Sequence, residues 1–104
     1  GSGEIFHPTH MTFNINDNVK VRLTEHGHEI MKARYDELVG DNLAFRKLYP
    51  YVEKEEDPNG WSSFQLWDLM HIFGKHIFNG GNLPFHTIIR IDEKDLGGEV
   101  REVE

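Results

Sequence analysis

Hydrophobic and polar residues alternate strictly near the start of the chain. Between residues 12 and 23 the apolar side chains keep a period of two around a polar cluster, Asn16-Asp17-Asn18; they are Phe13, Ile15, Val19, Val21 and Leu23. Successive side chains of a strand point to opposite faces of a sheet. The pattern therefore predicts a hairpin, or two consecutive strands, with one buried face.

A helical period replaces this alternation after Thr24. From about residue 25 to 39, apolar and small side chains recur on one side of a helix and charged side chains on the other. Thr24 suits the N-terminal cap, and Gly40 suits the left-handed conformation that often ends a helix. We expect one helix here that covers the sheet with a single apolar stripe.

Shorter patterns fill most of the remaining chain. Residues 41–51 predict a short helical turn that Pro50 ends, and residues 53–60 predict a charged turn. The run 85–91 after Pro84 contains several β-branched residues and predicts a strand. From Asp92 onward the chain is polar, and we expect it to be loose.

A second strong helix is predicted to begin at Ser62 or Ser63, with Gln65 closing a capping box on Ser62, and to end near Gly74. This helix is apolar on two sides. One side carries the residues expected in the core: Leu66, Leu69, Met70, Phe73 and Ile77. The nearly opposite side carries Phe64, Trp67, His71 and Phe78.

A helix that is apolar on two sides must be covered on two sides. The sheet can cover one, and the first helix with residues 49–51 can cover the other within the same chain. The alternative is a surface for self-association or for a partner, because contiguous aromatic patches mark interfaces. On that alternative Trp61, Phe64, Trp67 and His71 are candidate partner-binding residues.

Together these elements predict an α+β fold: a small antiparallel sheet, made of the N-terminal hairpin and a C-terminal strand, packed against two main helices. With 104 residues, the chain has the size of one domain. We place that domain at residues 11–95. Residues 1–10 resemble a leader left by cloning, since His10 precedes Met11 as a common cloning site encodes, and residues 96–104 are predicted to form a flexible acidic tail.

Charge narrows the possible partners. The formal net charge is −7, whereas binding to duplex nucleic acid normally depends on clustered Lys and Arg. Duplex DNA and RNA are therefore unexpected ligands, and a basic protein surface is the complementary partner. The acidic turn adds Glu55, Glu56 and Asp57 to the candidate partner-binding residues.

Catalytic and metal-binding patterns are weak. The chain has no Cys, which excludes a thiol nucleophile and thiolate zinc ligands. The pairs His26–His28 and His71–His76 lack the i, i+4 spacing that chelates from one helix face, although a site across elements, such as His71 with His86, stays open. Gly80-Gly81 lacks a phosphate-loop context. We therefore predict no enzyme activity, no catalytic residues, no metal and no cofactor.

Two further sequence features bear on the location of the protein and on DNA binding. No apolar run approaches the roughly 20 residues needed to cross a bilayer, so we expect no membrane contact and a cytoplasmic protein. The segment Leu23-Thr24-x-x-Gly27 occurs in many winged-helix regulators. A basic recognition helix is missing, however, and we interpret the motif as packing geometry.

Three stretches carry a resemblance: "FNINDNVKVRLTEHGHEI", "SSFQLWDLMHIFGKHI" and "LPF", in that order. From Met11 to about Asp95 the chain resembles a group of small accessory proteins encoded by tailed phages and prophages. The resemblance implies a phage gene product that acts inside the bacterial host, often by binding. It assigns no catalytic residues.

The sequence thus predicts a non-catalytic, phage-encoded accessory protein that binds a host protein or defence system, or itself, through the aromatic helix face and the acidic surface. A first alternative is an oligomeric sponge for a small nucleotide ligand, with Arg34, Arg90 and Lys75 contacting phosphate. A second is a minor virion component.

Overall fold

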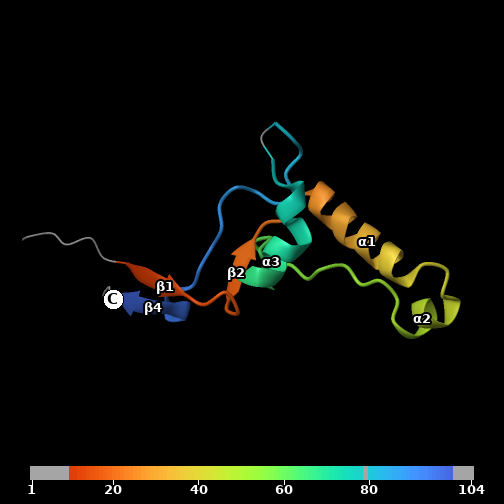
Figure 1. Ribbon diagram of the computed structural model, residues 1–104, viewed down its shortest axis with the longest axis horizontal. Coiled ribbons are helices and arrows are strands. Elements are labelled where there is room, and N and C mark those ends of the chain that lie inside the picture. Colours follow the sequence, from red (N-terminus) through yellow and green to blue (C-terminus); the bar gives the residue numbers. More distant parts are fainter. Residues whose placement is uncertain (1–9, 79, 100–104) are drawn as a thin grey trace, which may run out of the picture.

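The computed structural model describes residues 10–78 and 80–99, which form a small α+β structure (Figure 1). The α+β class predicted from the sequence is confirmed. The helices are α1 (Glu25–Val39), α2 (Leu43–Leu48) and α3 (Leu66–Phe73), with 3₁₀ turns at Gly74–His76 and Glu93–Asp95. The strands are β1 (Met11–Phe13), β2 (Asn18–Val21), β3 (Ser62–Gln65) and β4 (Leu96–Glu99).

Strand β2 lies at the centre of the fold. It pairs antiparallel with β3, placing Val19 opposite Phe64 and Val21 opposite Ser62. Its other edge carries two isolated bridges, from Leu23 to Phe85 and from Lys20 to Arg90. The alternating pattern explains this position, because Val19, Val21 and Leu23 all face the core.

Helix α1 begins and ends at the residues predicted from its caps. The Thr24 side chain accepts a hydrogen bond from the Gly27 N–H group, and Gly40 ends the helix with a positive φ of 58°. Gly27 lies directly against the backbone of Pro84, and the Thr24 N–H group donates to the Pro84 carbonyl. The interpretation of Leu-Thr-x-x-Gly as packing geometry agrees with these contacts.

The core is small and centres on α3. Phe73 is completely buried, and its ring packs edge-to-face against Phe64 of β3 and against Phe85. The other buried members of the cluster come from β2, α1 and α3: Val19, Val21, Leu23, Ile30, Leu69 and Ile72. Strand β3, helix α3 and the segment after Pro84 therefore meet on one aromatic ring.

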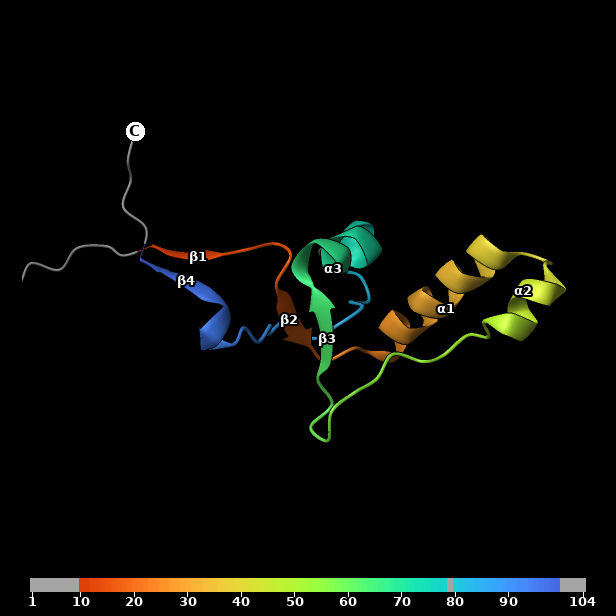
Figure 2. The same cartoon turned by 90° about the horizontal axis from the view of Figure 1, so that it is seen from below.

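The ends of the molecule extend away from this core. Strands β1 and β4 pair as a separate two-stranded ribbon on one side, while α2 lies at the far end beyond α1 (Figure 2). The principal-axis extents are 69 × 31 × 30 Å, and the radius of gyration is 18.7 Å. A compact globule of this length has a radius of gyration near 13 Å, so the chain is distinctly elongated.

Several predicted elements require correction. β1 and β2 do not form a hairpin, since each pairs with a distant strand. The second helix begins at Leu66 rather than at Ser62 or Ser63, because these serines lie in β3 and Ser62 donates instead to the Glu55 carbonyl. No capping box forms there. The run 85–91 makes only the two bridges instead of a continuous strand.

The predicted termini are only partly described. Residues 96–99, placed in the flexible tail, form β4 instead, so a loose chain from Asp92 is wrong for this part. Apart from His10, the predicted leader lies outside the described residues, as does the rest of the predicted tail.

Replacing Phe73 by Ala should lower the free energy of unfolding by about 3–5 kcal/mol, because the cavity would open where three segments meet. Urea unfolding followed by fluorescence measures this. Phe78→Ala is the matched control, since that ring is exposed and its loss should cost at most about 0.5 kcal/mol. Equal losses for the two variants would contradict the proposed core.

Gly27→Ala should destabilise the protein even though Ala favours helix over Gly by about 1 kcal/mol. A Cβ atom at this position would collide with the Pro84 carbonyl, so either α1 or the segment behind it must move. Ala33→Gly on the exposed side of α1 tests the ordinary propensity effect and should cost about 1 kcal/mol. Thermal unfolding compares both with wild type, and a stabilised Gly27→Ala protein would show that the contact is not tight.

Candidate functional site

The outward side of α3 presents an apolar surface. Trp67, Met70 and His71 are exposed and recur at helical spacing, and the indole of Trp67 lies 6.4 Å from the His71 ring, centroid to centroid. Beyond the helix, Ile77 and Phe78 are also exposed. We call Trp67, Met70, His71, Ile77 and Phe78 the α3 patch.

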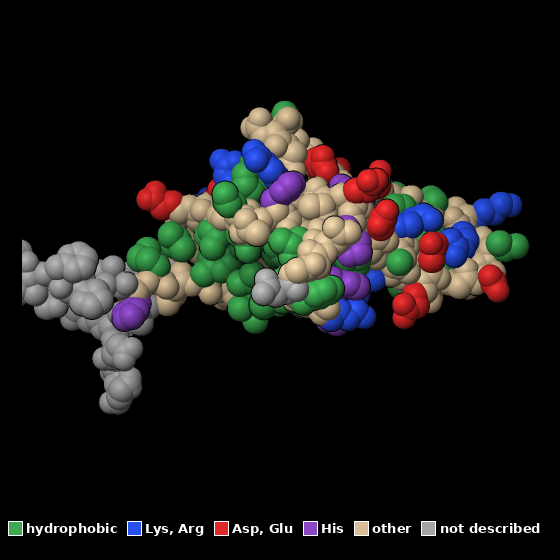
Figure 3. Space-filling view, turned by 90° about the horizontal axis from the view of Figure 1, so that it is seen from above, with side chains coloured by type: hydrophobic (Ala, Val, Ile, Leu, Met, Phe, Trp, Pro, Cys, Tyr) green, Lys and Arg blue, Asp and Glu red, His purple; other side chains and the backbone are tan. Residues whose placement is uncertain are grey.

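The β1–β2 connection extends this surface. The backbone N–H group of Trp67 donates to the carbonyl of Ile15. The Ile15 side chain is itself exposed. In the space-filling view hydrophobic side chains gather over the middle of the molecule, while acidic side chains lie mainly over the half that holds α1 and α2 (Figure 3). The apolar region is thus set apart from the acidic one.

The α3 patch agrees only in part with the residues predicted for it. Trp67 and His71 lie in it, with Trp67 42% exposed. The prediction for Phe64 is wrong, because that ring is 4% exposed and belongs to the core from a strand, not a helix. The prediction that Met70 and Ile77 face the core is also wrong, because they are 52% and 47% exposed, and Ile72 is buried instead. Starting the helix four residues too early caused the error at Phe64, whereas the error at Met70 lies in which side of the helix was expected to face the core.

Trp61 belongs to a different surface. It directly precedes β3, and its indole lies under the guanidinium of Arg22, 4.4 Å from the ring centroid. It lines two depressions of the structure, and Trp67 lines neither of them. The structure therefore does not bring the two tryptophans into one site.

The acidic turn is largely engaged in contacts within the chain. The Asp57 carboxylate accepts hydrogen bonds from the backbone N–H groups of Trp61 and Asn59. The bond from Trp61 is the main cause that holds the pKa of Asp57 below its ordinary value. Glu56 lies 3.0 Å from the His28 ring, so Glu55 alone of the three predicted residues has an exposed side chain without such a contact among the described residues.

A second apolar surface lies around α2. No residue of this helix is buried, and the exposed apolar side chains on and beside it are Leu38, Leu43, Phe45, Leu48, Tyr49 and Val52. We call residues 38–52 the α2 arm. Sequence patterns predicted the helix but not its exposure, because its distance from the core depends on the whole fold.

Polar contacts attach the α2 arm to α1. Arg46 donates to the Asp36 carboxylate at 3.1 Å and to the Gly40 carbonyl, while the Tyr35 hydroxyl donates to the carbonyl of Tyr49. The hydrogen bond from Arg46, with a smaller contribution from Lys32, holds the pKa of Asp36 below its ordinary value. These contacts fix the arm without burying its apolar side chains.

The cations suggested for a nucleotide ligand do not share one site. Arg34 and Lys75 line a depression beside Tyr35 and Tyr51, whereas Arg90 lies next to Lys20 and Trp61. Within residues 10–78 and 80–99, no group of three or more His, Asp or Glu side chains is placed to hold a metal ion. No helix in the described part of the chain combines the length and apolar character required to span a membrane.

No protein-family model matches this chain, and neither do the curated proteins or the solved structures with which it was compared. The resemblance to small phage proteins therefore stays a prediction.

The contact between Asp36 and Arg46 has a testable pH dependence. The folded-state pKa of Asp36 is lowered. Ionised Asp36 therefore contributes to folding stability above the pKa of an unfolded Asp, and this contribution is lost as pH falls through the lower folded value. We expect NMR titration to show Asp36 and the α2 amides changing together at acid pH. Arg46→Gln should raise the Asp36 pKa towards its ordinary value, while Lys47→Gln should not; an unchanged pKa in Arg46→Gln would exclude the contact.

Proposed function

We propose that this is a non-catalytic binding protein that works through contact with another protein surface. One observation carries the proposal: among the described residues, fifteen large hydrophobic side chains are exposed, whereas nine hydrophobic side chains are buried. Burial of apolar surface is the main favourable term in folding and in most protein association. A chain that leaves this much apolar surface in water gains stability when a second protein covers it.

The α3 patch is the better formed of the two apolar surfaces. Tryptophan and methionine are enriched at protein interfaces and Lys and Glu are depleted there, and the α3 patch has this composition. The opposite side of the helix is anchored in the core through Leu69, Ile72 and Phe73. Because the helix is already fixed, a partner need not order it on binding.

The α2 arm supports the same proposal. A six-residue helix is not stable alone in water, and nothing in the described chain covers the apolar side of α2. Polar contacts hold it beside α1, which keeps its leucines outward. The arm therefore offers a second contact for the same partner or for another copy.

The resemblance to phage accessory proteins favours a host bacterial protein as the partner. The net charge of −7 supports a partner with a basic surface, since complementary charge speeds encounter and guides orientation. Self-association is the alternative, in which the apolar surfaces of two copies cover each other. The mass of the purified protein in solution distinguishes self-association from binding to a host protein, because only self-association raises it.

Trp67→Glu tests the α3 patch, because a carboxylate at the centre of an apolar contact cannot be desolvated cheaply. Since Trp67 is half exposed, the variant should fold with nearly wild-type thermal stability. Association should weaken at least tenfold, measured by light scattering for self-association and by pull-down from host lysate for a host partner. Ala33→Glu on the exposed side of α1 introduces the same charge elsewhere and should behave as wild type.

Comparison of Trp67→Glu with Ala33→Glu separates an effect at the α3 patch from a general effect of the added charge. Loss of association in Trp67→Glu but not in Ala33→Glu supports the α3 patch. A monomeric wild-type protein that captures no host protein, or equal association in both variants, overturns it. An unfolded Trp67→Glu protein would place Trp67 in the core and remove the surface from consideration.

A further inference from the structure

On the outer face of the central sheet, basic side chains lie beside Trp61, with the acidic turn next to them. Odd-numbered residues of β2 face the core, so Lys20 and Arg22 point to the opposite face. On the β3 side the register continues from the pair Val21–Ser62 and places Trp61 opposite Arg22. On the other side, the backbone N–H group of His86 donates to the Arg22 carbonyl, so His86 is the neighbour of Arg22.

Two guanidinium groups converge on the indole of Trp61. Arg22 lies 4.4 Å and Arg90 5.8 Å from the ring centroid. Cation–π contacts of this kind fix the guanidinium plane and leave its N–H groups available to an anion. The arrangement favours planar recognition of an oxyanion, for which Arg is better suited than Lys.

Carboxylates of the protein do not neutralise these two groups. The ion pairs among the described residues involve His26, His28, Lys32 and Arg46, and none involves Arg22 or Arg90. Asp57 is near enough for Arg90 to influence its pKa. Its carboxylate already accepts two backbone hydrogen bonds, and it lies outside the pocket that Arg22 lines.

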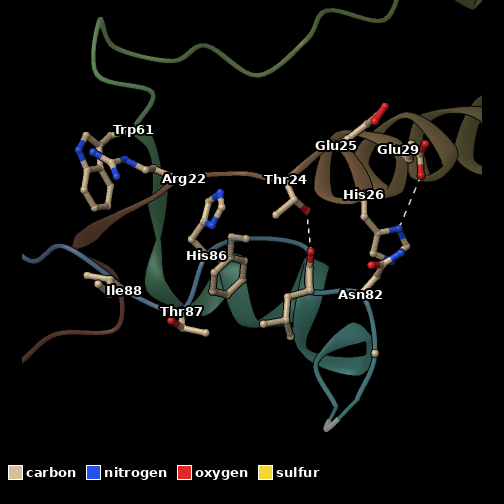
Figure 4. A pocket seen from close by; sticks show the side chains of 13 residues that line it. Arg22, Thr24, Glu25, His26, Glu29, Trp61, Asn82, His86, Thr87 and Ile88 are labelled. Carbon is tan, nitrogen blue, oxygen red and sulfur yellow. Dashed lines mark hydrogen bonds and ion pairs between the residues drawn. The ribbon is translucent and has the colours of Figure 1, made fainter.

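Arg22, Trp61 and His86 form one end of a pocket of about 810 Å³, a volume within the range of small-molecule sites. Figure 4 shows these side chains grouped on one side of the pocket, with Glu25, Glu29 and Asn82 on the other side, beyond Thr24. One end thus offers cations and an aromatic ring. The other offers carboxylate and amide oxygens, which accept hydrogen bonds, together with His26, whose Nδ1 lies 3.6 Å from the Glu29 carboxylate.

The pocket wall is held by contacts that do not depend on a ligand. The Thr24 hydroxyl donates to the Leu83 carbonyl at 2.6 Å, and its N–H group donates to the Pro84 carbonyl. Gly27 packs against the same backbone. These contacts connect the start of α1 to residues 83–86, so both ends of the pocket keep their spacing before a ligand binds.

We propose that this pocket binds a nucleoside monophosphate whose base carries amino groups, with guanine as the best fit. The phosphate contacts Arg22 and His86, with Arg90 adding charge across Trp61. The base lies towards Glu25 and Glu29, where adjacent N–H donors of guanine match a carboxylate. This site shares no residue with the α3 patch and stands independently of the proposed protein contact.

The pocket carries Arg22 at one end and the carboxylates of Glu25 and Glu29 at the other. This arrangement favours a single nucleotide over a polynucleotide. A continuous strand would carry its next phosphates towards Glu25 and Glu29, where like charges repel it. Binding of extended nucleic acid also needs a basic path along the backbone. Here Arg22 is the one Lys or Arg side chain that lines the pocket, and it lies at one end.

Calorimetry on the full chain with GMP, UMP, guanosine and inorganic phosphate tests the proposal. GMP should bind at least about tenfold more tightly than each of the other three, because each lacks either the phosphate or the amino-bearing base. Arg22→Ala should weaken GMP binding at least about tenfold, since it removes a charge-assisted contact. Arg34→Ala removes the same side chain from an exposed site on α1 and should leave binding unchanged.

A second variant separates recognition of the base from recognition of the phosphate. Glu25→Gln combined with Glu29→Gln should weaken GMP binding and leave inorganic phosphate unaffected or slightly tighter. Absence of GMP binding to the folded wild-type protein overturns the proposal, as does wild-type affinity in Arg22→Ala. Equal affinity for GMP and phosphate would also overturn it, since the base would then contribute nothing. None of these results depends on the association test with Trp67→Glu.

Discussion

The packing around Phe73 is the constraint on which the rest of this structure depends. Its ring joins β3, through Phe64, to the segment after Pro84, through Phe85, while its own helix is held against β2 by the buried cluster. The core is small, so it can order only the elements that touch it. The α2 arm and the β1–β4 ribbon lie beyond it, which explains both the elongated shape and the large exposed apolar surface.

Local signals predicted the elements whose structure is determined locally. Helix α1 begins at a Thr cap and ends at a Gly with positive φ, and β2 follows the strict alternation of its side chains. The predicted helix start at Ser62 is wrong, although a serine with Gln three residues later is also a good helix start. Pairing with β2 overrides that preference, since it gives the backbone of Ser62–Gln65 hydrogen-bond partners and buries Phe64.

Contacts between distant residues limited the prediction of the sites. Periodicity found Trp67 and His71, which lie on the exposed side of α3. The early helix start misplaced Phe64, and the expected core stripe wrongly included Met70 in place of Ile72. The grouping of Arg22, Trp61, His86 and Arg90 follows from strand register and from two bridges to β2. These four residues are spread over most of the chain, and no local spacing relates them. The alternation of β2 did contain one usable signal, because it placed Lys20 and Arg22 together on the face away from the core.

The two proposed surfaces lie on opposite sides of the sheet, and this arrangement has a functional consequence. α3 packs on the side that receives Val19 and Val21, whereas Arg22 and Trp61 occupy the other side. A protein on the α3 patch would therefore leave the pocket open. Coupling between the two would have to pass through β3, whose Phe64 contacts Phe73 beneath the patch while Trp61 directly precedes the strand. Trp61 directly precedes the strand that anchors α3, so a ligand in the proposed pocket and a protein on the proposed α3 patch would contact opposite sides of the same strand.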